Sequence, residues 1–109
     1  MSSVSYDDFA KLDIRVAKII ATESIEGKSR IIKGQIDLGN DDQREVIIGG
    51  AQYYRPEDIV GKTVIVIANL EPKKMAGVES NAMLLAADVD DKPFWLTVNE
   101  DVPLGSLIK

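Results

Sequence analysis

A wholly apolar run, Val64–Ala68, leads into a segment that breaks every regular pattern, and a second apolar run, Met83–Ala87, follows it. Between the two runs lie Pro72, the adjacent pair Lys73 and Lys74, and a glycine. Proline has no amide hydrogen for strand pairing and glycine allows a tight turn, so the pattern predicts a strand, an exposed basic loop and a strand. Loops held by rigid strands concentrate binding residues, which makes this loop a candidate site. The alternative of a hairpin loop whose charges only keep it solvated stays open.

The inventory of reactive side chains is short, because the 109 residues include no cysteine and no histidine. Zinc sites, disulfides and imidazole catalysis are therefore excluded, and we expect no metal, no cofactor and no enzyme. The weakest hypothesis for the function is an enzyme in which Lys73 or Lys74 acts with Glu79 and Ser80, since nothing orients these side chains.

The length and hydrophobic content predict one domain over residues 1–109. No apolar run is long enough to span a membrane, and the first residues are polar and acidic rather than a signal peptide. We therefore expect a soluble cytoplasmic protein with no membrane contact.

Alternation of apolar and polar residues predicts a mainly β chain. The alternation fails at Lys18–Ile20, which predicts a bulge, and Gly34 within a strand predicts a close approach of the backbone. Ser5 has the position of a helix N-cap, so we expect a short helix to about Leu12 that plugs one end of the core. The expected main strands are 13–23, 30–38, 45–48, 63–70 and 83–87, with a short extra strand at 94–98.

Three further expectations concern the connections. Residues 49–55 hold at most a short helix that stops before Pro56. The strand 63–70 is apolar on both faces, so we expect it to be covered twice, the second time by another subunit. The apolar tail Val102–Lys109 is expected to dock on something.

Five main strands, the bulge and the short helices predict an all-β, five-stranded Greek-key barrel of the oligonucleotide/oligosaccharide-binding (OB) type, with a C-terminal extension. The net charge of −5 argues against indiscriminate coating of nucleic acid but allows a local basic face. Arg30, Lys33, Lys73 and Lys74 fall on the elements that line the usual ligand face of this fold. Few aromatic residues lie near these cations, which favours recognition of RNA shape over stacking of single strands.

Several segments together resemble the tRNA-binding domain appended to methionyl-tRNA synthetases, including its free-standing archaeal beta-subunit form and the bacterial structure-specific tRNA-binding protein. The resemblance spans about Phe9 to Lys109, and its most specific motif is Asn-Leu-x-Pro-Lys-Lys-x-x-Gly-x-x-Ser at residues 69–80. The segments are Phe9–Val16, Gln35–Gly39, Ile48–Ala51, Tyr53–Glu57, Val66–Lys74 and Met75–Ala87.

The resemblance implies an OB barrel, a homodimer and binding of tRNA by shape, either alone or as an accessory subunit of a methionyl-tRNA synthetase catalytic subunit. Two segments depart from the family pattern: Glu26–Ile31 replaces the common Pro-x-Ala-Asp-Lys-Leu, and Ile48–Ala51 replaces Ser-Gly-Ile. The tRNA-binding residues that the resemblance implies are Lys73, Lys74, Ser80, Asn81 and Met83 on the basic segment and Arg30 and Lys33 on the second strand.

Two questions stay open at this stage. A secretion-chaperone family shares the barrel, the dimer and much of the motif, so binding of unfolded or precursor polypeptides is the alternative function. The expected dimer surface is the strand 63–70 together with the tail Leu104–Ile108. The tyrosines Tyr53 and Tyr54 and the single Trp95 are expected to serve the core or an interface rather than RNA stacking.

Overall fold

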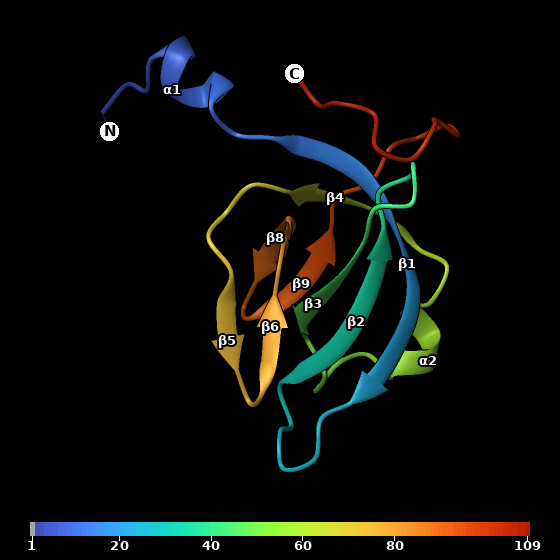
Figure 1. Cartoon of the computed structure of the whole chain (residues 1–109). Coiled ribbons are helices and arrows are strands. Elements are labelled where there is room, and N and C mark those ends of the chain that lie inside the picture. The colour runs from blue at the N-terminus through green and yellow to red at the C-terminus, as the bar shows by residue number, and fades with distance from the viewer. Residues whose placement is uncertain (1) are drawn as a thin grey trace.

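The computed structural model describes residues 2–109, and most of its regular structure is β-strand (Figure 1). Five strands form one antiparallel sheet in the order β3–β2–β1–β4–β7. The sheet curls until the β3 side meets the segment before β7, where the Asn81 amide donates to the Glu45 carbonyl at 3.0 Å. This nearly closed barrel confirms the predicted all-β, OB-like fold. The strands are β1 Ile14–Ser24, β2 Ile31–Asp37, β3 Gln43–Gly49, β4 Thr63–Ile67 and β7 Met83–Leu84.

Two small hairpins are added to the barrel: β5 (Lys73–Met75) with β6 (Val78–Ser80), and β8 (Ala86–Val89) with β9 (Lys92–Trp95). The basic segment is therefore a paired hairpin rather than the loop expected. The expected strand 83–87 is also wrong as one unit, because its first half pairs with β4 and its second half belongs to β8. The extra strand expected at 94–98 is present only in part, because β9 ends at Trp95 and residues 96–98 are not in a strand.

Both backbone irregularities predicted in the strands are present. The pairing of β1 with β2 shifts register between Ile19 and Ala21, which confirms the bulge. A Cβ atom added to Gly34 would lie 2.5 Å from Cδ1 of Ile48, which confirms the close approach. Together they let long strands bend around a small core.

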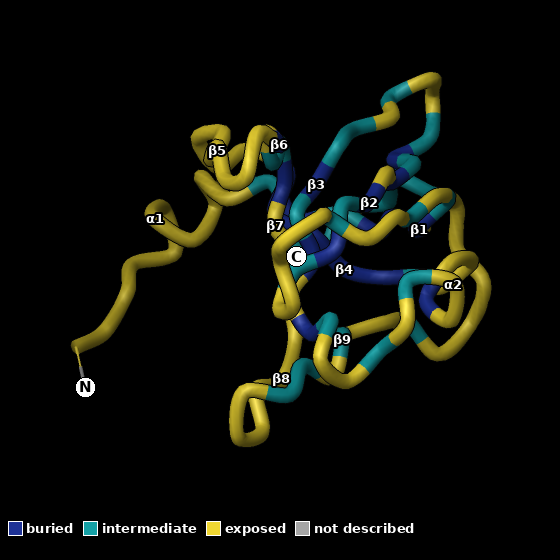
Figure 2. Tube along the Cα trace, turned by 90° about the horizontal axis from the view of Figure 1, so that it is seen from below, coloured by how far each residue is buried: buried dark blue, intermediate teal, exposed yellow. Residues whose placement is uncertain are grey.

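The helix α1 (Tyr6–Ala10) begins as predicted, with the Ser5 hydroxyl accepting from the Asp8 amide at 3.1 Å. Its expected role as a plug is wrong, because none of its residues is buried and it extends away from the barrel (Figure 2). The Asn69 side chain ties the end of this arm, donating to the Lys11 carbonyl at 2.6 Å.

The second helix, α2 (Pro56–Ile59), corrects the expectation of a helix that stops before Pro56. Proline opens this helix because its missing amide hydrogen has no partner in a first turn. Within residues 2–109, neither helix has the length and apolar character that crossing a membrane requires.

Strand β4 is covered on both faces, as its composition predicts. Val64 and Val66 pack inside the barrel, whereas Ile65 and Ile67 form a second apolar cluster on the other face. The second cluster is covered by the chain itself, through Leu85, Val98, Leu104 and Ile108. The docked tail is thus confirmed, and the second cover of β4 comes from the chain itself rather than from the other subunit expected.

Candidate nucleic-acid interface

The β5–β6 hairpin carries the two adjacent lysines on opposite faces. Lys73 is paired with Ser80, and Lys74 with Glu79. Successive residues of a strand point to opposite sides, so Lys73 faces the barrel and Lys74 faces away. Both side chains are exposed, and within residues 2–109 neither makes an ion pair. The hairpin therefore presents two lysines in two directions, neither held in an ion pair among the described residues, with Glu79 opposite Lys74 and Glu71 in the groove that Lys73 lines.

A groove lies on the barrel side of this hairpin and gathers three of the predicted residues, Lys73, Ser80 and Met83. Apolar side chains form most of its wall, and the two methionines in it are flexible and polarisable. A lysine at the rim of such a groove can meet a phosphate or a carboxylate. The remaining lining residues are Ile47, Leu70, Glu71, Met75 and Ala82.

Two of the predicted contact residues hold the hairpin in place. The Ser80 hydroxyl accepts from the Ile47 amide at 3.0 Å and donates to the Ala82 carbonyl at 2.9 Å. The Asn81 side chain donates to the Glu79 carbonyl at 3.3 Å, beside the groove rather than in it. Both polar groups are engaged within the chain, so their first role is to position the hairpin.

Arg44 closes the base of the hairpin, a role that sequence reasoning missed. Its guanidinium donates to the Ala68 carbonyl before the hairpin and to the Asn81 carbonyl after it, the latter at 3.2 Å. The Asp42 carboxylate holds this guanidinium by two hydrogen bonds, each 3.0 Å long. These bonds lower the pKa of Asp42 below its ordinary value. Nothing in the polar turn before β3 signals this clamp.

Lys33 lies on the outer face of β2, between two carboxylates. Its ammonium is 3.4 Å from Glu23 on β1 and 3.6 Å from Glu45 on β3. The hydrogen bond to Glu23, followed by the attraction of Glu45, raises the pKa of Lys33. The sequence placed Lys33 on the second strand, but only the strand register reveals the two acids beside it. The positive charge expected here is therefore compensated.

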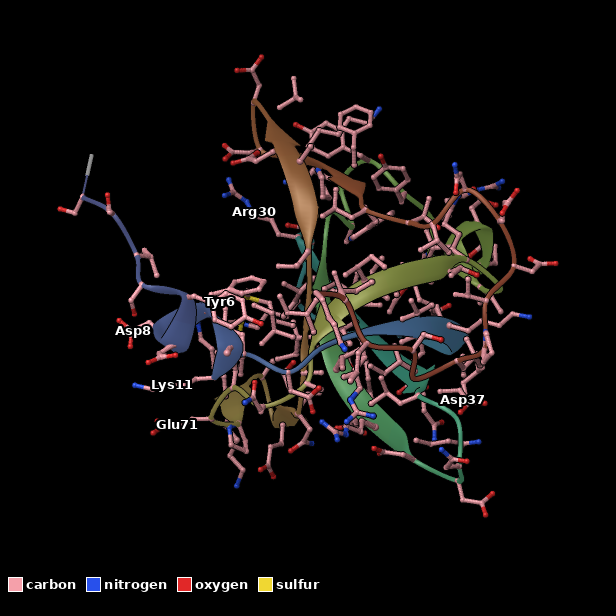
Figure 3. The ribbon with its side chains drawn as sticks, turned by 90° about the horizontal axis from the view of Figure 1, so that it is seen from above. Tyr6, Asp8, Lys11, Arg30, Asp37 and Glu71 are labelled. Carbon is pink, nitrogen blue, oxygen red and sulfur yellow. The ribbon has the colours of Figure 1, made fainter. Side chains whose placement is uncertain are left out.

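Arg30 lies apart from the hairpin. Its carbonyl accepts from the amides of Gly50 and Ala51, at 3.0 and 3.2 Å, in the turn after β3. Figure 3 shows Arg30 well separated from Glu71, which lines the groove. Most of the predicted residues thus lie on or next to the β5–β6 hairpin. Lys33 lies on the neighbouring sheet face, and Arg30 lies away from both.

The aromatic residues of the barrel gather around β9, away from the groove. The rings of Tyr54 and Trp95 are 4.6 Å apart and pack against the core, and the Tyr54 hydroxyl donates to the Pro93 carbonyl at 2.8 Å. The core role expected of Tyr54 and Trp95 is confirmed. Tyr53 is half-exposed, with the Lys92 ammonium 5.8 Å from its ring centroid.

Comparison with known proteins adds a family. Residues 14–107 match the family model described as "Putative tRNA binding domain". Among curated proteins, the chain is 49% identical over 106 residues to a methionine–tRNA ligase of Methanocella arvoryzae, covering 97% of the chain and 15% of that protein. A methionine–tRNA ligase of Thermococcus kodakarensis is 46% identical over 109 residues, covering 100% of the chain and 15% of the ligase. The chain thus spans only 15% of the length of each of these two relatives.

Two solved structures with the same architecture come from different kinds of protein. A protein of Pyrococcus horikoshii, described as related to methionyl-tRNA synthetase, superimposes with a TM-score of 0.91 at 35% identity, covering 100% of both chains. The chaperone CsaA of Bacillus anthracis superimposes with a TM-score of 0.88 at 25% identity, covering 99% of this chain and 100% of CsaA.

Proposed function

The chain belongs to the tRNA-binding domain family, and from that premise we propose that it binds folded tRNA through the β5–β6 hairpin, without catalysing a reaction. The observation that carries the proposal is the pair Lys73 and Lys74, exposed and held in no ion pair within residues 2–109, on a chain of net charge −5. When such lysines neutralise phosphates, the counterions condensed on the nucleic acid are released, which favours binding. We also propose that residues 1–109 form one domain and that the protein acts in the cytoplasm, where it would meet tRNA.

Shape recognition follows from what the hairpin offers. It presents charge and an apolar groove, whereas the aromatic rings lie elsewhere around β9. Contacts to phosphates position RNA without reading its sequence, and an unstacked single strand would need aromatic platforms. We therefore propose that the hairpin meets the backbone of a folded tRNA.

The test is a filter-binding assay with folded tRNA at low and at moderate salt. Lys73→Glu combined with Lys74→Glu should weaken binding about tenfold or more, and should flatten the dependence of affinity on salt by about one to two phosphate contacts. Lys18→Glu with Lys62→Glu is the matched control, because it makes the same charge change at two other exposed lysines without ion pairs. Equal losses in both variants would contradict the assignment of the hairpin.

We further propose that the protein acts as a homodimer. The arm α1 exposes Tyr6 and Phe9, and the tail exposes Leu107, at the same end of the molecule (Figure 1). The tail runs beside the start of β1, where the Ile108 amide donates to the Ile14 carbonyl at 2.8 Å. A second copy that covers this end would also double the RNA contacts available to one ligand. Light scattering at micromolar concentration should give twice the monomer mass, and a monomer would contradict the dimer.

An accessory role beside a separate methionyl-tRNA synthetase catalytic subunit is the finer proposal. It is supported by the methionine–tRNA ligases that contain a similar segment. Adding the protein to such a catalytic subunit should lower the KM for tRNA and leave kcat nearly unchanged, because a binding module contributes to ground-state affinity. An unchanged KM would contradict the accessory role, and only the proposal of a free-standing tRNA-binding protein would remain.

The groove beside the hairpin supports one alternative, a chaperone for unfolded polypeptides. Its apolar wall includes Ile47, Leu70, Met75 and Met83, and two similar structures are CsaA chaperones. Flexible methionines suit a groove that accepts varied side chains. A reduced, unfolded polypeptide should then compete with tRNA for the protein. Competition that is abolished by Met75→Asp, with tRNA binding intact, would favour the chaperone.

A further inference from the structure

The outer face of the β1–β2–β3 sheet holds a charge cluster whose balance is negative. Glu23 lies opposite Lys33 in the pairing of β1 with β2, and Glu45 reaches the same ammonium from β3. One cation is thus shared by two carboxylates. These three side chains line a shallow hollow, together with Ala21, Thr22, Gly34 and Gln35.

The cluster adjoins the hairpin. Lys33 is paired with Ile47, whose amide donates to the Ser80 hydroxyl and whose side chain lines the groove. The carbonyl of Glu45 accepts from the Asn81 amide at 3.0 Å. A nucleic acid that contacts the hairpin and continues along the sheet would therefore cross Glu23, Lys33 and Glu45.

Such a path is the one that single strands take on barrels of this type, across the second and third strands. Here the path leads over two acids and one compensated lysine. A phosphate entering the hollow would be repelled by both carboxylates, because the single ammonium of Lys33 is already paired with them. A folded RNA that touches only the hairpin avoids the hollow.

We propose that Glu23 and Glu45 determine RNA specificity: by holding Lys33 they keep extended single-stranded RNA off the outer face of β1–β2–β3, so that folded RNA at the hairpin is preferred. This inference rests on the proposed tRNA binding and adds to it the repulsive element that any selective site needs. The two carboxylates are positioned by strand pairing, so the barrier is present in the free protein.

The experiment compares folded tRNA with single-stranded polyuridylate of the same length, by filter binding at low salt. Glu23→Gln with Glu45→Gln keeps side-chain size and removes two negative charges. Affinity for polyuridylate should rise about tenfold, roughly threefold for each unit charge removed a few Å from a phosphate in water. Affinity for tRNA should rise less than threefold, so the preference for tRNA falls.

Two further variants make the result specific. Glu26→Gln with Glu100→Gln removes the same charge at exposed acids without ion pairs, and should raise both affinities slightly and equally. Lys33→Met on the Glu23→Gln, Glu45→Gln background should lower the affinity for polyuridylate again by about threefold, one unit charge, because the freed lysine is what the strand then meets. Thermal unfolding of each variant shows that it is folded.

An unchanged ratio of the two affinities in the Glu23→Gln, Glu45→Gln variant would overturn the inference, as would an equal change in the Glu26→Gln, Glu100→Gln control. Either result leaves tRNA binding by the unmodified protein untouched. Failure of the unmodified protein to bind tRNA would instead remove the proposed function and this inference together.

Discussion

The two hairpins that follow β4 have the same tight turn geometry, but they differ in surface charge and in how they are attached to the barrel. Each turns through two residues with positive φ, Ala76 and Gly77 in one and Asp90 and Asp91 in the other. Turns of this kind match the natural twist of paired strands. The β8–β9 hairpin ends in acids, whereas the β5–β6 hairpin carries Lys74 beside its turn. Backbone shape is shared and surface chemistry is not.

The way each hairpin is held to the barrel differs more. Trp95 and Tyr54 fix β8–β9 by packing against the core. The β5–β6 hairpin has one buried side chain, Val78, and is otherwise held at its base by Arg44 and Ser80. Aromatic packing gives a structural element that stays in place. A polar clamp at the base leaves the rest of the hairpin exposed for a ligand.

The largest expected effect tests the aromatic attachment. Trp95→Ala should lower the free energy of unfolding by about 3 kcal/mol, because it removes a large side chain packed on the core. Below the unfolding transition, tRNA binding should be retained, since the basic hairpin is held separately. Urea unfolding measures the first effect. A loss below about 1 kcal/mol would show that β8–β9 does not depend on this packing.

A smaller effect is expected at the polar clamp. Arg44→Ala should cost roughly 2 kcal/mol, because the Ala68 and Asn81 carbonyls and the Asp42 carboxylate lose a charged donor. Amide hydrogen exchange of residues 73–80 should rise while that of β8–β9 stays the same. Arg55→Ala is the control, since Arg55 makes only exposed ion pairs. Equal exchange in both hairpins would refute independent attachment.

The two lysines of the basic hairpin separate its faces. Lys73→Ala and Lys74→Ala remove the same charge, one beside the groove and one on the far side. If RNA lies over the groove, the Lys73 variant should lose about threefold to tenfold in affinity and the Lys74 variant less. Filter binding at fixed salt measures both. The reverse order would place the RNA on the outer face of the hairpin.

The smallest effect is a pH dependence. The pKa of Asp42 is lowered by Arg44, so the clamp stabilises the fold above the unfolded pKa of about 3.9 and weakens as pH falls through the lower folded value. Exchange of the basic hairpin should therefore rise in acid before that of β8–β9. Asp42→Asn should flatten the acid limb of stability, and a limb identical to that of the unmodified protein would exclude this origin.

Much of the barrel could be predicted from local patterns. The bulge near Ile20, the close approach at Gly34 and the N-cap at Ser5 are all present, because each has a signal at its own position in the sequence. The wrong expectations involve partners that are distant in sequence. The arm α1 has an apolar pattern, yet nothing local indicates that it does not pack on the barrel.

The candidate site shows the same division. The sequence placed Lys33 on the second strand and Lys73 in an exposed basic segment. It did not indicate that Lys33 is compensated by Glu23 and Glu45. It also missed Arg44, whose two carbonyl partners, Ala68 and Asn81, lie more than twenty residues away.

Alternation and turn residues alone determined that this chain forms a β-barrel, since a period of two decides which side chains can be buried. Tertiary structure decided which cations are held in ion pairs and which residues cover β4. Those outcomes depend on strand register and on the path of the tail, Leu104 and Ile108 included. Register brings residues far apart in sequence within a few Å, and electrostatic interactions are decided at that distance.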